Sequence, residues 1–408
     1  MNNNVQIKKF LISIKPIYYV SKLLGVVPIT ISGDKLITIN CASTVYTVIV
    51  LVFILTCSII SVQQRVGAAG VKVTIVVTEC FMVIVATLKS IVAILKCLST
   101  NRHMIKKLLE KILTIDKYIL FDFNASYRRM FKFMSIHVLV TFFFTIMLFV
   151  YDTSVWSGEV GLLYILPSYP VRIINLCTIL QFCDLVLLTR NRISIVNIML
   201  ENLLKEVEAN NMELKLLNIS GIKIKRVFPP VEISDMVLNP SINIRISKQG
   251  RIHELRQIWD EICDIVRIIN AAYGLLILLD IAIGTIELLL SSYLVLAALL
   301  KLDDINIEQF VSLQTGWLIF YFFKLISVTA PCQSASNEEG NTEILIQKLL
   351  LSKNIDSLTQ LELRLFSQQI FQQKIKFTAS GFLNIDYYLL LTIIGGVTTY
   401  LIIAVQYK

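Results

Sequence analysis

The sequence predicts an all-α membrane protein with seven transmembrane helices. Of its 408 residues, 55% are hydrophobic and 16% are charged, whereas soluble domains carry roughly 25% charged residues. Seven apolar segments are each long enough to cross the hydrocarbon core of a bilayer, which takes about 20 helical residues. A chain of this composition and pattern belongs in lipid.

The seven segments follow one another from the first third of the chain to its end. The predicted spans are Asn40–Val62, Val73–Leu95, Met134–Tyr151, Leu162–Leu188, Ile268–Leu300, Phe310–Pro331 and Tyr387–Val405. The regions flanking the second and fourth spans carry amphipathic patterns, so we expect helices that extend beyond the membrane. The middle of the longest polar region, around Pro229, Pro230 and Pro240, is expected to be a loop.

The distribution of Lys and Arg predicts the orientation. With the amino terminus inside the cell, the inner segments hold 31 basic residues and the outer links hold 4. Without the longest inner loop the counts are 19 and 4. Cytoplasmic loops carry the excess of Lys and Arg. We therefore expect a cytoplasmic amino terminus, an external carboxyl terminus, and most of the polar mass inside the cell.

This orientation divides the chain into four parts. Residues 1–39 form a cytoplasmic arm, since Lys15 and Pro16 interrupt the apolar core that a signal peptide needs. Residues 40–331 hold six spans, with a ligand pocket on the outer side and basic cytoplasmic loops at 96–133 and 189–267. Residues 332–382 form a cytoplasmic anchor segment, and residues 383–408 form the seventh helix.

Several function classes find no support in the sequence. The three His and eight Cys show no metal-ligand spacing, and there is no phosphate-binding glycine loop or nucleophile elbow. We expect no enzyme, no metal and no cofactor. The net charge of +9 is explained by basic loops at a membrane rather than by nucleic acid. A transporter of a small solute remains an alternative, although no internal repeat is visible.

The end of the chain carries a specific motif. Thr399-Tyr400, five apolar or small residues, Gln406 and an aromatic residue resemble the closing signature of insect gustatory receptors, which usually end this motif in Phe where this chain has Tyr407. The stretch Phe377–Asp386 is similar to the same family. The stretch Pro16–Lys22, together with Gly25, resembles the amino-terminal arm of some members of this family, including the fructose-sensing type.

This resemblance implies a function and an assembly. It implies a gustatory receptor that acts as a ligand-gated, non-selective cation channel in the plasma membrane of a chemosensory neuron. An extracellular tastant would open it. The channel would contain four subunits, as a homotetramer or as a heteromer with related receptors, and the seventh span would line the pore. A metabotropic seven-helix receptor is a further alternative, but it would have the opposite orientation.

Polar and aromatic side chains recur at helical spacing on two spans. They are Asp280, Gly284, Glu287 and Ser291 on the fifth, and Gln314, Trp317, Tyr321 and Lys324 on the sixth. Spacings of three and four place each set on one helical face. Their outer members predict a ligand pocket, although helix packing explains the same pattern. For the deeper Asp280 and Lys324 we favour a structural ion pair.

Further polar residues lie near the ends of the spans. Trp156, Tyr164 and Tyr169 near the outer boundary are most simply an aromatic interface belt, and Trp156 and Tyr164 are also candidate ligand contacts. Lys89 lies near the end of its span and can extend to the headgroups. Arg172 needs a partner inside the membrane, and Glu79 is the candidate. A pocket that combines carboxylates and aromatic rings suits a sugar better than an apolar alkaloid.

A stripe of small and polar residues follows the seventh span. It consists of Thr392, Gly396, Thr399, Ile403 and Gln406. Such a stripe suits close helix packing or the wall of a pore, and we favour the pore. Tyr400 and Tyr407 would pack behind this wall. Asp386, just before the helix, is either a helix cap or part of an acidic ring at the pore, and the cap is the simpler interpretation.

Overall fold

Helices form nearly all of the part of the chain that the computed structural model describes, which comprises residues 3–27, 30–32, 35–37, 41–67, 73–118, 124–156, 161–220, 247–299, 307–352 and 355–406. The helices are α1 (Asn3–Leu23), α2 (Cys41–Val66), α3 (Val73–Lys96), η1 (Cys97–Asn101), α4 (Arg102–Tyr118), α5 (Asn124–Trp156), α6 (Leu162–Ile165), η2 (Leu166–Ser168), α7 (Tyr169–Ser220), α8 (Lys248–Leu299), α9 (Ile307–Leu350), α10 (Ser357–Gln372) and α11 (Tyr387–Gln406). Two antiparallel hairpins complete the fold, β1 (Thr30–Ser32) with β2 (Lys35–Ile37), and β3 (Thr378–Ala379) with β4 (Leu383–Asn384).

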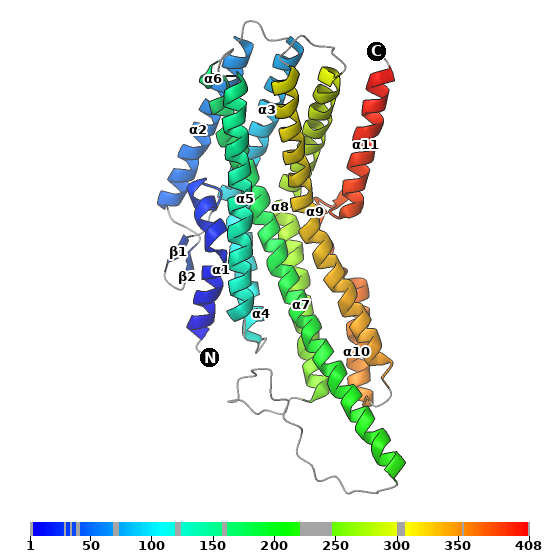
Figure 1. The fold of residues 1–408 in the computed structure, drawn as a ribbon. Helices are drawn as coiled ribbons and strands as arrows, with labels where there is room; N and C mark the ends of the chain where they lie inside the picture. The colour runs from blue at the N-terminus through cyan, green and yellow to red at the C-terminus, as the bar shows by residue number, and fades with distance from the viewer. Residues whose placement is uncertain are drawn as a thin grey trace.

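Within the described residues, seven helices are long and apolar enough to cross a membrane. They are α2, α3, α5, α7, α8, α9 and α11, one for each predicted span, which confirms the fold class. In Figure 1 the carboxyl end of α11 lies at the top of the molecule, and α10 and the end of α7 lie at the bottom. Following the predicted orientation, we call these the outer end and the cytoplasmic end.

The surface of the spans is apolar where it would face lipid. On α2, Val45, Ile49 and Phe53 are exposed, and on α5, Leu139 and Phe143 are exposed. Most of the membrane part of α7 is buried instead, because the other spans surround it. A soluble protein would not expose apolar side chains along whole helices, so this arrangement agrees with a bilayer around the bundle and α7 at its centre.

The helices continue well beyond the membrane on the cytoplasmic side. α7 and α8 have 52 residues each, or about 78 Å at 1.5 Å per residue, so the helical extensions expected on both sides of the long polar region are confirmed. The middle of that region, 221–246, lies outside the described residues. Pro331 does not end α9, which has 44 residues and runs on to Leu350. Packing of α9 against α7 and α8 compensates for the backbone hydrogen bond that a proline removes.

The cytoplasmic parts of α7, α8 and α9 form a bundle with α10. Trp259 and Phe366 are fully buried there, with ring centroids 6.0 Å apart. Asp356 caps α10 by accepting the N–H of Thr359 at 3.0 Å, and hydrogen bonds from Thr359 hold the pKa of this carboxyl below its usual value. The predicted anchor segment 332–382 therefore contains the end of α9, α10 and most of the β3–β4 hairpin, and its place between subunits stays a prediction.

The amino-terminal arm is also a folded element. α1 packs along α5 and α7, and its Phe10, Leu11 and Ile14 are buried. It lies beside the lower part of α5 (Figure 1), and its place in the cytoplasm stays a prediction.

A buried ion pair ties the arm and three other helices together. Arg192 on α7 donates from Nε and Nη2 to the Asp116 carboxylate on α4, at 3.1 and 2.7 Å. Tyr127 on α5 donates its hydroxyl to the same carboxylate, and the guanidinium lies 5.9 Å from the Phe10 ring centroid on α1. Arg192 and Asp116 are 1% and 2% exposed. Two opposite charges that are both removed from water depend on each other.

We predict that Asp116→Asn lowers the free energy of unfolding by about 3–5 kcal/mol, because it leaves Arg192 as an uncompensated buried charge. The double variant Asp116→Leu with Arg192→Leu removes both charges and should unfold much closer to the wild-type temperature. Thermal unfolding of the detergent-purified proteins, followed by size-exclusion fluorescence, checks both. An Asp116→Asn protein no less stable than the double variant would contradict this account.

Candidate ligand site and pore helix

A cavity of about 350 Å³ lies at the outer end of the bundle. Ligand pockets in proteins typically measure about 300–1,000 Å³, so the cavity can hold a small molecule. All six residues that the sequence analysis assigned to a ligand line it: Trp156, Tyr164, Glu287, Gln314, Trp317 and Tyr321. The structure thus brings together side chains from α5, α6, α8 and α9.

Aromatic rings form two walls of the cavity. On α9, Trp317 and Tyr321 stack with centroids 5.6 Å apart. On the other side, the rings of Trp156 and Tyr164 lie 6.2 Å apart. Trp156 and Tyr164 are 7% and 2% exposed. The interpretation of these two residues and of Tyr169, which is 5% exposed, as an interface belt is therefore wrong, because all three side chains are buried inside the bundle.

Arg172 does not pair with Glu79 as expected. Its Nη1 donates to the Tyr321 hydroxyl at 3.2 Å, and its guanidinium carbon lies 4.4 Å from the Trp317 ring centroid. Glu79 instead accepts from Arg65 at 3.1 Å and from the Tyr164 hydroxyl at 2.7 Å. The expected pair was wrong because α2 extends to Val66, which brings Arg65 into the bundle rather than leaving it in an outer link.

Sequence reasoning also missed Asp152 as a lining residue. Asp152 accepts a hydrogen bond from the Tyr169 hydroxyl at 3.0 Å and faces the cavity. It was expected in a link after the third span, but α5 continues to Trp156. The spacing of four between Asp152 and Trp156 is the signal that could have placed both on one helical face.

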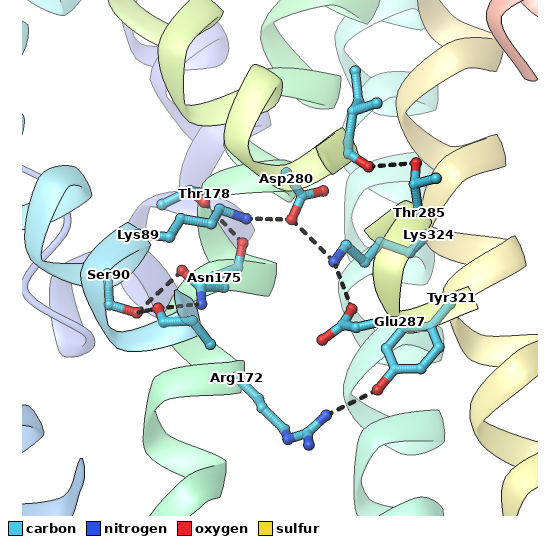
Figure 2. Close-up of polar contacts among 12 residues, drawn as sticks. Lys89, Ser90, Arg172, Asn175, Thr178, Asp280, Thr285, Glu287, Tyr321 and Lys324 are labelled. Carbon is cyan, nitrogen blue, oxygen red and sulfur yellow. Dashed lines mark hydrogen bonds and ion pairs between the residues drawn. The ribbon is translucent and has the colours of Figure 1, made fainter. Parts of the chain in front are cut away.

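A chain of buried charges begins at Glu287 in the cavity wall and continues through Lys324 and Asp280 to Lys89 (Figure 2). Lys324 Nζ lies 3.6 Å from Glu287 Oε2 and 3.0 Å from Asp280 Oδ1, which confirms the expected Asp280–Lys324 pair. Lys89 also pairs with Asp280 and is 1% exposed. The expectation that Lys89 reaches the headgroups is therefore wrong, because Asp280 on α8 neutralises it inside the bundle.

The formal charges of the cavity wall and of the ion network that adjoins it at Glu287 balance. The cations are Arg65, Lys89, Arg172 and Lys324, and the carboxylates are Glu79, Asp152, Asp280 and Glu287. Glu287 Oε2 has no hydrogen-bond donor in the structure. A site of this kind offers both donors and acceptors without a net charge, so it complements a polar ligand that is itself neutral.

The second candidate region is α11. One face packs on the bundle through Leu389, Ile393 and Val397, which are 7–9% exposed. The predicted pore stripe lies elsewhere on the helix, and all of its members are exposed: Thr392, Gly396, Thr399, Ile403 and Gln406.

Three further residues of this region were named from the sequence. Tyr400 is 59% exposed, so the described helices leave most of its side chain uncovered. Asp386 accepts the N–H of Leu389 at 2.9 Å, which is the cap geometry, and a ring of Asp386 side chains remains a prediction. Tyr407 lies outside the described residues.

The chain is similar to known chemosensory proteins. It is 26% identical over 328 residues to putative gustatory receptor 28b of Drosophila melanogaster, covering 75% of this chain and 64% of that protein. It is 29% identical over 170 residues to putative gustatory receptor 28a, covering 40% and 37%. It is 22% identical over 143 residues to the gustatory receptor for sugar taste 43a, covering 35% and 33%. The matched regions thus span less than two thirds of the length of these relatives.

The fold is similar to that of a solved receptor. The insect olfactory receptor OR5 from Machilis hrabei superposes with a TM-score of 0.68 over 100% of both chains, at 11% sequence identity. Its complex with eugenol gives the same TM-score. The sequence pattern of the family described as 7tm chemosensory receptor matches residues 14–408. The chain therefore belongs to the 7tm chemosensory receptor family.

Proposed function

We propose that this chemosensory receptor is a ligand-gated, non-selective cation channel. An extracellular tastant binds in the outer cavity, and four copies of α11 surround the pore. The channel assembles as a homotetramer or as a heteromer with related receptors, in the plasma membrane of a chemosensory neuron.

The outer cavity is the observation that carries this proposal. It gathers all six candidate ligand residues at one end of the bundle. Helix α11 stands beside the bundle (Figure 1), and its small, polar stripe is exposed. Small and polar residues suit a water-filled wall or a close helix contact, and bare lipid is a poor partner for them. A binding site and a helix face that the described part of the chain leaves exposed are what a gated oligomer requires.

A sugar is the ligand class that the cavity supports best. Aromatic rings can stack on the apolar face of a sugar ring, and the balanced charges can bind its hydroxyls. A relative that matches part of this chain is a gustatory receptor for sugar taste, and the solved receptor of similar fold holds the small molecule eugenol. Both findings support a small-molecule ligand for this chain.

Current recordings from cells that express only this chain test the function. A panel of sugars and bitter compounds should contain at least one that evokes a cation current. Solute uptake without current would favour a transporter, and a response that requires a G protein would favour a metabotropic receptor.

For the cavity, we predict that Trp317→Ala raises the half-maximal ligand concentration at least about tenfold, equivalent to about 1.4 kcal/mol. It removes the ring that stacks on Tyr321 and holds Arg172. Glu287→Ala should weaken or abolish the response, because it removes a carboxylate that faces the ligand. Dose–response curves at matched surface expression measure both effects.

Ile319→Ala and Ile286→Ala are the matched controls. Both positions lie on the same helices as the tested residues, and their side chains are 53% and 42% exposed. These two variants should respond like the wild type. If Trp317→Ala and Glu287→Ala also keep the wild-type dose dependence, the cavity is only a packing feature.

For the pore, we predict that Ile403→Ser or Gln406→Ala changes the current without ligand or the selectivity among cations. A ring of Ile403 would close the pore by excluding water, and a ring of Gln406 would lie one turn further out. Recordings under exchanged cations measure both properties. Ile402→Ser, beside the stripe and 54% exposed, is the control. Unchanged leak and selectivity in both pore variants would remove this face from the pore.

A further inference from the structure

The β3–β4 hairpin connects α10 to α11, and α8 holds it through Asn270. The Asn270 Nδ2 donates to the backbone oxygen of Lys376 at 2.8 Å. Its Oδ1 accepts the N–H of Thr378 at 3.1 Å. One amide side chain thus binds two backbone groups at the start of the hairpin and fixes this segment against α8.

Gly274, one turn further along α8, lies directly against the hairpin turn. A Cβ atom at this position would lie 2.8 Å from the backbone nitrogen of Ser380 and 3.2 Å from its Cα. Such a contact is too short, so any side chain here would force α8 or the hairpin to move. The turn itself contains Ser380 and Gly381 with φ of 53° and 77°, a conformation that leaves it little freedom to adapt.

Helix α9 holds the same hairpin from its other side. Gln333 Oε1 accepts the N–H of Tyr387, the first residue of α11, at 3.4 Å. Glu339 Oε1 accepts the N–H of Ile375 at 2.9 Å. Phe377 and Ala379 of the hairpin region are 2% and 0% exposed. The hairpin and its flanks are therefore fixed on α8 and α9, two of the helices that line the cavity, and α11 begins directly after it.

The rest of α11 is held more loosely. Beyond Leu389, Ile393 and Val397, most of its described side chains are exposed. The place where α11 starts is consequently determined by the hairpin. Glu287, which lines the ligand cavity, lies on the same unbroken helix as Gly274, about 20 Å away at 1.5 Å per residue.

We propose that Asn270 and Gly274 are positioning residues that transmit movement of α8 at the cavity to the pore helix α11. This inference rests on the proposed function. A ligand that contacts Glu287 shifts α8 as a rigid rod, the hairpin follows because the amide and the backbone contact hold it, and α11 moves with the hairpin. A variant that weakens the contact between α8 and the hairpin, or that forces the two apart, should therefore still bind ligand but open the channel less.

The variants Asn270→Leu and Gly274→Ala test the proposal. Asn270→Leu removes both hydrogen bonds while it keeps a side chain of similar size. Asn270→Asp keeps the oxygen that accepts the N–H of Thr378. Gly274→Ala introduces the short contact. Gly340→Ala on α9 is the control, because a Cβ there would have no neighbour within 4 Å.

At equal surface expression, the maximal ligand-evoked current should fall at least about fivefold in Asn270→Leu and less in Asn270→Asp. The ligand should still raise the melting temperature of the purified proteins.

Labelling of the pore helix decides the question without any current. Each variant is combined with Ile403→Cys, and a membrane-impermeant thiol reagent is applied from outside the cell. The wild-type chain, which lacks Cys at position 403, measures the labelling of the native cysteines. Asn270→Leu and Gly274→Ala should change the labelling rate at least about fivefold, and Gly340→Ala should not. If Asn270→Leu and Gly274→Ala label at the same rate as Gly340→Ala, the proposal is overturned, even where the wild type carries a current. If the wild type carries no current but labelling changes, the positioning role stands and the channel function fails.

Discussion

A charge inside the hydrocarbon core must be neutralised at close range, and this constraint governs the middle of the molecule. Lys89, Asp280 and Lys324 come from α3, α8 and α9, and none of them is more than 8% exposed. Each would be costly alone, whereas with Glu287 of α8 the two lysines and two carboxylates balance and join three spans (Figure 2). The same network reaches Glu287, which also lines the outer cavity. Architecture and candidate binding site therefore depend on one set of contacts.

Helix α8 is the element that the separate parts of the protein share. Its cytoplasmic part buries Trp259 against α10, its middle holds the hairpin before α11, and its outer part carries Asp280 and Glu287. A helix of 52 residues without an interior proline can move as one body. α11, by contrast, leaves its small and polar stripe uncovered. The chain thus combines a tightly packed core with one span that packs on it through a single face.

The spans were predictable because long apolar runs have few other solutions in a protein of this composition. The six cavity residues were also found, since spacings of three and four report a helical face. Asp152 and Arg65 were missed because helix ends are hard to locate, and both lie in the last turns of helices that run further than expected. The partners of Lys89 and Arg172 could not be derived, because contacts between spans far apart in sequence leave no local pattern.

The most direct test of the account is a cryo-electron microscopy structure of the purified protein in lipid nanodiscs, with the compound that evokes the largest current. The account predicts four chains around one axis, with Thr392, Ile403 and Gln406 of α11 facing that axis. It also predicts ligand density beside Trp317 and Glu287. A particle in which the α11 stripe faces lipid, or ligand density at any other place in the chain, would contradict it.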